Sequence, residues 1–282
     1  MSETVEFSET ITTAPAQALA GLLDCAPPDK SEGLPPLWHW VYLLDRPAQA
    51  DLGRDGHRAT TGVPHPPEPG RRRMWAGGSI RTHEQLSFDE PAVRRSYVRD
   101  SVDKQGRTGR LTFVTAVHEI SQHGRVVVEE EQHILYRDAA AQTSTAEPAA
   151  VLDDTDLQPH ERRIEVNPVL LFRFSALTYN GHRIHYDRDY SRQIEGYPGL
   201  VVHGPLQALL MAEAARALQP STASPSTFDY RLVSPLFDHQ GMVVGALPDD
   251  GGPADASPVQ TTVRDGSGRT TASGTFRLLT RD

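Results

Sequence analysis

One helical stripe followed by four strand-like runs makes up the C-terminal part of the sequence, and this order constrains the fold more than any other feature. Between Pro205 and Pro220, apolar residues recur at the spacing of a helix that buries one side: Leu206, Leu209, Leu210, Ala214, Ala217 and Leu218. Turn-forming residues separate the runs that follow: Phe228–Phe237, Met242–Leu247, Val259–Arg264 and Thr270–Leu279. A single helix followed by an antiparallel meander predicts an α+β fold in which the sheet wraps around the helix.

The first half of the sequence is a weaker version of the same plan. Arg110–Ile120 and Arg125–Tyr136 are rich in β-branched residues and are joined by a short polar turn, which predicts a long hairpin. Leu37–Leu44 is mainly apolar, and we expect it to form a strand; after the linker, in the second half, we expect the mainly apolar Val169–Leu177 to form a strand or a strand-like approach. Pro15–Asp24 predicts a short helix, so the chain is interpreted as a pseudo-duplicated α+β protein.

Three polar stretches of the same half are assigned to structure rather than to chemistry. Asp51–Arg73 is dominated by Gly, Pro, His and Arg, and we expect an ordered loop. Arg71–Arg73 is interpreted as a solvated turn, with contact to coenzyme A phosphates as the alternative. Glu129–Glu131 is interpreted as a solvated strand edge rather than as a set of catalytic acids.

A length of 282 residues predicts two domains of ordinary size. Residues 141–160 lack hydrophobic periodicity and are rich in Ala, Thr, Asp and Pro, which is typical of a linker. We therefore expect an N-terminal domain over 1–140, a linker over 141–160 and a C-terminal domain over 161–282.

Composition excludes several classes of protein. No apolar run is long enough to cross a membrane, and the acidic start MSETVEFSET differs from a secretory signal, so we expect a cytoplasmic protein without membrane contact. A net charge of -9 argues against a general nucleic-acid binder. Cys25 is the only cysteine, which excludes an intramolecular disulfide and a zinc site built on cysteines.

The densest polar segment is TYNGHRIHYD at 178–187, and Val202-His203-Gly204 follows it where the predicted helix begins. Together they resemble the active-site signature of the (R)-specific enoyl-CoA hydratases and related MaoC-like hot-dog dehydratases. In that signature an Asp, an Asn-Pro pair and a His precede a helix that opens with Val-His-Gly. His185 matches the family's His, whereas Asn180 stands at the position of the Asp and His182-Arg183 replaces the Asn-Pro pair.

The longer segment through EGYPGLVVHGPLQ is more similar to a two-domain subfamily. That subfamily includes the hydratases of mesaconyl-C4-CoA and itaconyl-CoA and the mitochondrial 3-hydroxyacyl dehydratase, and Arg72–Gly78 resembles its N-terminal domain. The resemblance implies a double hot-dog fold, in which the N-terminal copy has lost the motif and shapes the acyl pocket while the C-terminal copy holds the chemistry. It also implies a homodimer.

The chemistry of hydrating an unsaturated thioester explains why residues of these types are needed. A base must take a proton from the water that attacks C3, and a donor must hold the charge that grows on the thioester oxygen. We expect His185 to be the base and the Gly204 N–H, at a helix N-terminus, to be the donor. Asn180 can orient water but cannot accept its proton, so our hypothesis is that His185 both removes a proton and returns one to C2.

The neighbouring polar residues have both functional and structural interpretations. Arg183 is expected either to bind a substrate carboxylate or a phosphate, or to pair with Asp187 or Asp189. His182 is a substrate contact or a structural hydrogen bonder, and with His185 and either His203 or Asp187 it is also a metal-ligand alternative. The other substrate-binding candidates are Tyr179, His203 and Arg231, and we expect Arg231 to point away from Phe228 and Tyr230 on its strand.

The sequence therefore predicts a hydro-lyase that acts on a small branched dicarboxylic acid carried as a coenzyme A thioester, without a metal or redox cofactor. Mesaconyl-C4-CoA, converted to citramalyl-CoA, is the first candidate substrate and itaconyl-CoA the second. One alternative is a dehydratase of ordinary 3-hydroxyacyl chains on coenzyme A or acyl carrier protein. The others are a non-catalytic acyl-CoA-binding subunit and, ranked last, a thioesterase, for which the helix offers only Gln207 and Glu213.

Overall fold

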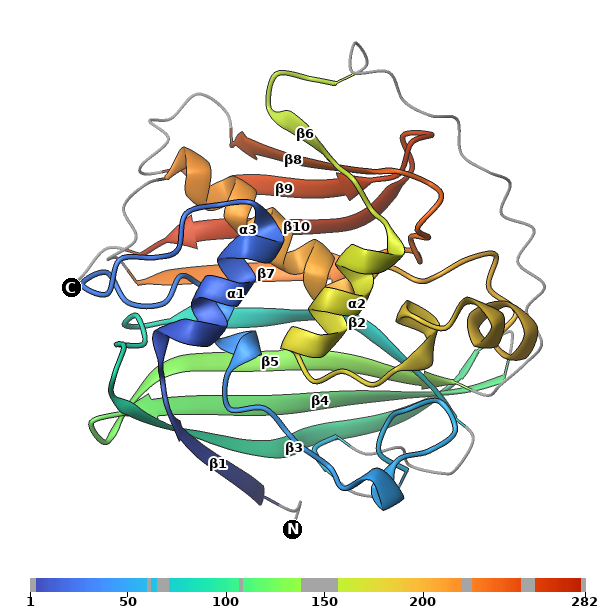
Figure 1. The fold of residues 1–282 in the computed structure, drawn as a ribbon, viewed down its shortest axis with the longest axis horizontal. Coiled ribbons are helices and arrows are strands. Elements are labelled where there is room, and N and C mark those ends of the chain that lie inside the picture. The colour runs from blue at the N-terminus through green and yellow to red at the C-terminus, as the bar shows by residue number, and fades with distance from the viewer. Residues whose placement is uncertain are drawn as a thin grey trace. The chain divides into compact units, whose positions relative to one another are not determined.

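The computed structural model contains two compact units, residues 1–140 with 176–182 and residues 141–175 with 183–282. The structure describes residues 4–59, 62–64, 71–106, 109–137, 157–219, 225–249 and 257–279. Most of the predicted linker, residues 141–156, lies outside the described residues. Each unit is described below by itself, and Figure 1 labels their elements.

The second unit is an antiparallel sheet with a long helix packed against it. Its described strands are β7 (Ser226–Leu232), β8 (Met242–Pro248), β9 (Val259–Arg264), β10 (Thr270–Leu278) and β6 (Glu161–Ile164). They pair in the order β7-β10-β9-β8-β6. The helix α3 (Gly204–Leu218) contacts β7, β8, β9 and β10, so it crosses the sheet as Figure 1 shows.

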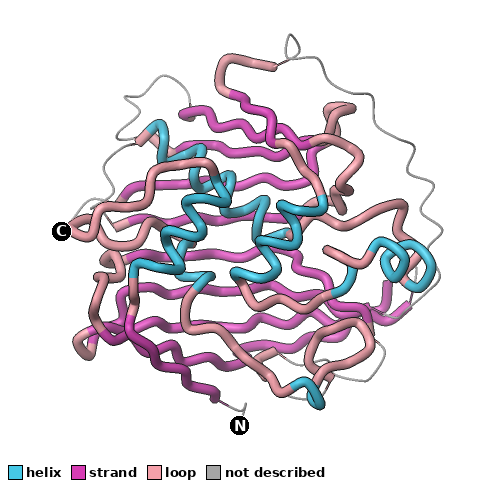
Figure 2. Tube along the Cα trace, viewed as in Figure 1, coloured by secondary structure: helices cyan, strands magenta, loops and turns pink. Residues whose placement is uncertain are grey.

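The helix and the four strands expected after it are confirmed. The first part of the apolar stripe of α3, Leu206 to Leu210, is buried because this side faces the sheet, whereas Ala217 and Leu218 at the end of the helix are exposed. Pro205 lies in the first turn of the helix, where its missing N–H costs no helical hydrogen bond. Figure 2 shows the strands that follow as a continuous magenta layer. This is the sheet wrapped on a helix that the C-terminal sequence predicts.

The expectation of a strand over Val169–Leu177 is wrong, because Pro168–Leu177 forms the helix α2. The Asn167 side chain accepts a hydrogen bond from the Leu170 N–H at 2.9 Å, which begins the helix in the manner of an N-cap. Phe174 is buried while Phe172 is 60% exposed. A continuous apolar run cannot distinguish a strand from a helix by periodicity, and here the cap decides.

The first unit contains a longer antiparallel sheet. Its described strands pair in the order β1-β3-β4-β5-β2. Their bounds are Thr4–Thr10 (β1), Pro91–Gly106 (β3), Gly109–Gln122 (β4), Arg125–Arg137 (β5) and Arg72–Thr82 (β2). The predicted hairpin is confirmed as β4 and β5. The sequence did not predict β1, β2 and β3, whose many charged residues conceal the alternation of a half-buried strand.

A short helix, α1 (Thr13–Leu23), confirms the helix expected near the N-terminus. Its first turn is held by the buried Tyr42, whose hydroxyl accepts the Ala16 N–H at 3.0 Å and donates to the Thr12 carbonyl at 2.5 Å. Burial raises the pKa of Tyr42 to about 12. The hydroxyl therefore remains protonated and can both donate and accept.

The expectation of a strand over Leu37–Leu44 is also wrong. The segment contains the 3-10 helix η1 (Trp38–Val41), flanked by Leu37 and Leu43 at positive φ. Trp38 and Leu37 are fully buried, so the apolar run contributes to the core without pairing in the sheet. The run is mainly apolar because most of it is buried, and the periodicity of such a run does not distinguish a strand from a helix.

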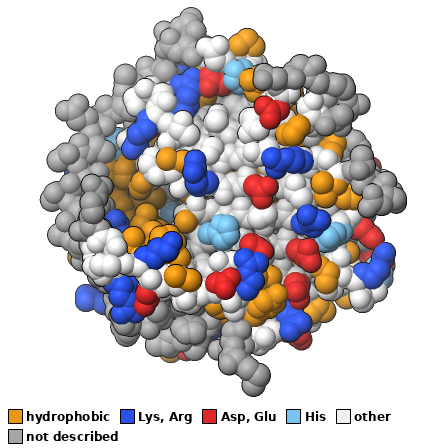
Figure 3. Space-filling model, turned by 180° about the vertical axis from the view of Figure 1, so that it is seen from behind, with side chains coloured by type: hydrophobic (Ala, Val, Ile, Leu, Met, Phe, Trp, Pro, Cys, Tyr) orange, Lys and Arg blue, Asp and Glu red, His pale blue; other side chains and the backbone are white. Residues whose placement is uncertain are grey.

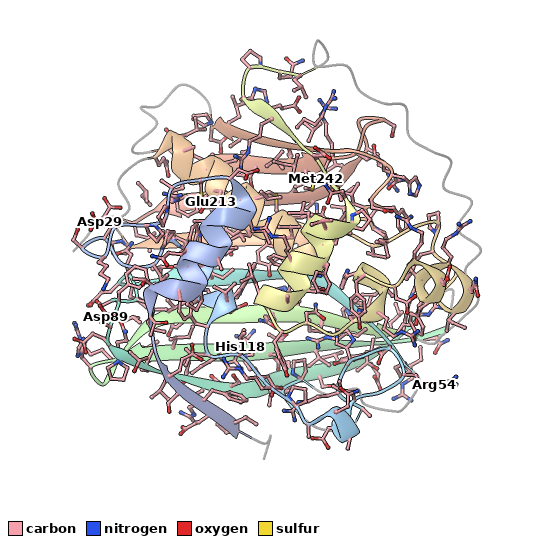
Figure 4. All side chains as sticks on the ribbon, in the orientation of Figure 1. Asp29, Arg54, Asp89, His118, Glu213 and Met242 are labelled. Carbon is pink, nitrogen blue, oxygen red and sulfur yellow. The ribbon has the colours of Figure 1, made fainter. Side chains whose placement is uncertain are left out.

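The interpretation of Glu129–Glu131 as a solvated edge is wrong for its central residue. β5 lies between β4 and β2, and Glu130 is buried. Its carboxylate lies 3.0 Å from His39 Nε2 and accepts a hydrogen bond from Trp40 Nε1 at 2.9 Å. Burial works to raise the pKa of Glu130, but His39, His118 and Gln132 lower it to about 2. Figure 4 labels His118, which lies on β4 opposite Glu130 in the strand register.

Other charged residues of the first unit form pairs across the exposed side of the sheet. Examples are Arg99 with Glu131 and Arg125 with Glu84. Figure 3 shows acidic and basic side chains interspersed on one face. The solvated turn expected at 71–73 is wrong, since Arg71 is buried against the Tyr136 and Arg110 carbonyls and residues 72 and 73 belong to β2. No helix among the described residues is long and apolar enough to cross a membrane.

Candidate active site

His185 is held in a defined orientation within the second unit. It ends the short helix η4 (Arg183–His185) and is buried, with 7% of its surface exposed. Its Nδ1 lies 2.7 Å from the Val201 carbonyl oxygen. Because a carbonyl only accepts, Nδ1 carries the hydrogen, and Nε2 of the neutral ring retains a lone pair. His185 is therefore oriented as a base that acts through Nε2.

His203 stacks on His185. The ring centroids are 3.6 Å apart and the planes differ by 20°. His203 is fully buried, and its Nε2 lies 2.9 Å from Ser175 Oγ on α2. Burial, together with repulsion from the His185 charge, holds the pKa of His203 well below its usual value. His203 is therefore neutral and supports His185 as a flat ring surface. Its expected contact with substrate stays a prediction.

Gly204 is the first residue of α3, directly after His203. A Cβ at this position would lie 2.1 Å from Leu232 Cδ1, so the space beside the backbone is already filled by β7. Glycine lets the start of the helix approach this strand. The N–H groups of a first helical turn have no acceptor within the helix, which is the property expected of an oxyanion donor.

Arg183 forms the ion pair that the sequence offered as one alternative. Its Nη2 donates to Asp187 Oδ2 at 2.7 Å, and its guanidinium lies 4.1 Å from the centroid of the Tyr190 ring. The Tyr190 N–H, followed by Arg183, lowers the pKa of Asp187. The Arg183 side chain remains 39% exposed, so a pair with Asp187 leaves part of the guanidinium open to solvent.

Arg231 lies on the outward side of β7. Phe228 and Tyr230 on the same strand are buried, while Arg231 is exposed. This confirms the predicted orientation, which follows from the alternation of side chains along a strand. Whether Arg231 contacts substrate stays a prediction.

Three predicted site residues belong to the first unit. Tyr179 is 55% exposed and has φ +50°, a conformation that turns the chain between α2 and the motif. The Asn180 side-chain oxygen accepts the His182 N–H at 3.0 Å, which fixes the loop in an Asx turn. His182 is buried against His57, with ring centroids 4.1 Å apart. His182 thus has a structural contact, whereas the roles of Tyr179 and Asn180 toward substrate stay predictions.

Two sets of residues beside the site were not singled out from the sequence. Ser175 was hidden because its segment reads as a strand, although its position just before the motif was a usable signal. Asp55 and His57 lie in a stretch interpreted only as an ordered loop. The Asp-Gly-His sequence at 55–57 combines a turn with two ligand-type side chains and was the available signal.

Comparison with known proteins assigns the chain to a family. The model of the family "Hydroxyacyl-thioester dehydratase type 2" matches residues 37–238. The mesaconyl-C(4)-CoA hydratase of Chloroflexus aurantiacus is 44% identical over 241 residues, which is 84% of this chain and 84% of that protein. The chain belongs to the hydroxyacyl-thioester dehydratase type 2 family. It is a hydro-lyase, as expected from the motif.

More distant relatives agree with this assignment. The mitochondrial hydroxyacyl-thioester dehydratase type 2 of Schizosaccharomyces pombe is 26% identical and matches 85% of this chain and 89% of its own length. A MaoC-like dehydratase structure from Phytophthora capsici has a TM-score of 0.73 at 12% identity, covering 99% of this chain and 95% of that one. HtdX of Mycobacterium tuberculosis has a TM-score of 0.64 at 16% identity, covering 98% and 100%. The double hot-dog fold is confirmed.

Proposed function

We propose that this member of the family adds water across the C2=C3 bond of mesaconyl-C4-CoA to give citramalyl-CoA. The observation that carries the proposal is the orientation of His185, whose Nδ1 is committed to the Val201 carbonyl. The 44% identity with a protein named mesaconyl-C(4)-CoA hydratase supports the choice of substrate. Itaconyl-CoA is the second substrate to test.

His185 performs the proton transfers in this proposal. Its Nε2 takes a proton from water as the oxygen attacks C3, and the imidazolium then returns a proton to C2. The same imidazole can perform both transfers, because the neutral ring accepts the proton from water and the imidazolium that results donates a proton to C2. His203 lies against the ring and is neutral, so no second positive charge opposes the imidazolium.

Gly204 and Asn180 are the two other residues to which the proposal assigns a role in the reaction. As the proton leaves water, negative charge moves onto the thioester oxygen, and the Gly204 N–H at the start of α3 is the proposed donor to this oxygen. Asn180 orients water by hydrogen bonds. Its side-chain oxygen accepts the His182 N–H, which leaves the amide NH₂ as its donor group.

Recognition of the free carboxylate requires a cationic partner, and we propose Arg183 or Arg231. The Arg183 guanidinium is paired with Asp187 but partly exposed, so a substrate carboxylate would share it. Arg231 is exposed on β7 and extends from the sheet. Tyr179, His182 and His203 are the remaining proposed substrate contacts.

We further propose the setting in which the reaction occurs. The acyl-CoA is the partner of the site, the N-terminal domain shapes the acyl pocket, and the protein is a cytoplasmic homodimer. Proton transfer by an imidazole and a backbone donor needs neither a metal nor a redox cofactor.

The test compares hydration of mesaconyl-C4-CoA, itaconyl-CoA and crotonyl-CoA by loss of enoyl absorbance, with free thiol measured in parallel. We expect kcat/KM for mesaconyl-C4-CoA to exceed that for crotonyl-CoA by about 10- to 100-fold, because only the former offers a carboxylate to an arginine. Faster turnover of crotonyl-CoA or longer chains would favour the 3-hydroxyacyl dehydratase. Release of thiol would indicate a thioesterase, and binding without turnover a non-catalytic subunit.

A further inference from the structure

Three side chains of metal-ligand type lie together in the first unit, and the proposed hydration uses none of them as an acid or a base. They are Asp55, His57 and His182, and each offers one ligand atom within 4.8 Å of the other two. His182 is buried, whereas Asp55 and His57 are partly exposed. The group thus has a closed side and an open side.

A tight turn presents Asp55 and His57. The Gly53 N–H donates to the His57 carbonyl at 2.6 Å, and Leu52 pairs with Arg58 across the turn. The His57 N–H donates to Asp55 Oδ1 at 3.1 Å, while Asp55 Oδ2 lies 3.5 Å from His57 Nδ1. Figure 4 labels Arg54, which marks this turn. The backbone therefore holds the carboxylate beside the imidazole.

Two glycines set the distance between the turn and the segment that carries His182. Gly56 has φ +88°, and a Cβ on it would lie 1.9 Å from the Gly181 carbonyl oxygen. A Cβ on Gly181 would lie 2.9 Å from the Gly56 oxygen. Only glycine at both positions permits this approach. The approach brings the His57 and His182 rings to 4.1 Å between centroids, tilted by 44°.

We propose that Asp55, His57 and His182 form a binding site for a divalent transition-metal ion, for which Zn²⁺ is the best match. Two imidazoles and one carboxylate are borderline ligands of the type that zinc accepts, and three protein ligands leave the fourth position to water. Around a tetrahedral zinc with bonds of about 2.0–2.1 Å, the donor atoms lie about 3.4 Å apart. The ligand atoms, which lie up to 4.8 Å apart, must approach one another by up to about 1.4 Å to surround the ion, and side-chain rotation supplies this movement.

The site shares His182 with the proposed substrate contacts, but it goes beyond the proposed hydration because no proton transfer passes through Asp55, His57 or His182. Its effect is to fasten the turn at 52–58 to the segment 180–182. An ion that binds the folded chain and not the unfolded one stabilises the fold by mass action. The site is therefore structural or regulatory, and its occupancy can be measured without any activity assay.

The experiment titrates Zn²⁺ into the tag-free full-length chain after treatment with a chelator, using calorimetry, and repeats the titration with Co²⁺ monitored by visible absorption. We expect one equivalent to bind, with Co²⁺ giving the d–d bands of a four-coordinate site. His57→Ala and His182→Ala should each weaken Zn²⁺ binding by at least about 100-fold, because each removes a direct ligand. Asp55→Asn should weaken it less.

The matched control is His83→Ala, because His83 pairs with Glu129 at 3.1 Å on an exposed surface and no third side chain of metal-ligand type joins them among the residues that the structure describes. This variant should bind Zn²⁺ as the wild type does. His57→Gln and His182→Gln preserve side-chain volume if the alanine variants do not fold, and circular dichroism checks each variant. Absence of one-equivalent binding in the wild type, or unchanged binding in the folded His57 and His182 variants, would overturn the proposal. Neither result depends on which thioester the enzyme hydrates.

Discussion

His39 in the first unit and His185 in the second unit of this hydro-lyase are both buried, but they have opposite partners. In the first unit, His39 lies 3.0 Å from the buried carboxylate of Glu130. In the second unit, His185 meets a backbone carbonyl and His203 meets a serine hydroxyl. A buried carboxylate ties the imidazole into the core through a hydrogen bond, whereas a carbonyl fixes one ring nitrogen and leaves the other as a candidate base. The partner, rather than burial alone, is the reason we propose His185 as the base and treat His39 as structural.

The largest effect on stability is expected at Glu130. Glu130→Ala should lower the free energy of unfolding by about 3–5 kcal/mol, because it leaves His39 and Trp40 buried without their acceptor. Denaturant unfolding measures this loss. Glu129→Ala is the matched control on the same strand: Glu129 is 50% exposed, and losing its pair with His83 should cost less than about 1 kcal/mol. Equal losses in the two variants would contradict the comparison.

The second prediction concerns the loss of folding stability at acid pH. Burial lowers the pKa of His118 to about 4 from 6.5, so the unfolded chain binds more protons between these values. Stability that is present at neutral pH is lost as the pH falls from about 6.5 to 4, and at pH 5 the loss is on the order of 2 kcal/mol. His203 acts in the same direction in the second unit.

Unfolding curves at pH 7 and pH 5 test this, with His118→Gln as the comparison variant. The variant should lose less stability than the wild type between the two pH values. Below pH 4.5 the lowered pKa of Glu130 adds a further loss, because its carboxylate must be protonated as the pH approaches 2. A wild-type stability that is flat between pH 7 and 5 would mean that His118 is not buried as described.

The smallest effect is expected at Gly204. Gly204→Ala places a methyl group against Leu232 Cδ1 and should cost about 1 kcal/mol, at the low end for overpacking because the end of a leucine side chain can move. Unfolding of Gly204→Ala, Leu232→Ala and the double variant gives the coupling between the two positions. Additive losses would show that the methyl group does not meet Leu232.

Sequence reasoning predicted the elements whose apolar residues follow a clear period and assigned two mainly apolar segments to the wrong kind of element. The stripe of α3 has the period of a helix, and β7 and β9 alternate between buried positions and exposed or partly buried ones. Leu37–Leu44 and Val169–Leu177 are mainly apolar. The first contains a 3-10 helix flanked by residues at positive φ, and the second forms an α-helix that begins at the Asn167 cap. The strand β3 failed for the opposite reason, since exposed charges cover most of its length.

The candidate site likewise contains some residues that the sequence could identify and others that it could not. His185, Asn180 and Gly204 could be identified because a local motif carries them. The Val201 carbonyl that orients His185 is a backbone group with no sequence signal, and Ser175 reaches His203 only because α2 is a helix. Long-range partners of this kind are set by tertiary structure. The meeting of His57 with His182, 125 positions apart in the sequence, could not be predicted for the same reason.

The central claim is that His185 is the base and His39 is not. The direct test is the kcat for hydration of the preferred thioester by His185→Asn and His39→Asn, each compared with the wild type at equal folded concentration. We predict that His185→Asn lowers kcat by about 10²- to 10⁴-fold with little change in unfolding, while His39→Asn loses stability and keeps its kcat. A His185→Asn variant as active as the wild type would contradict the account.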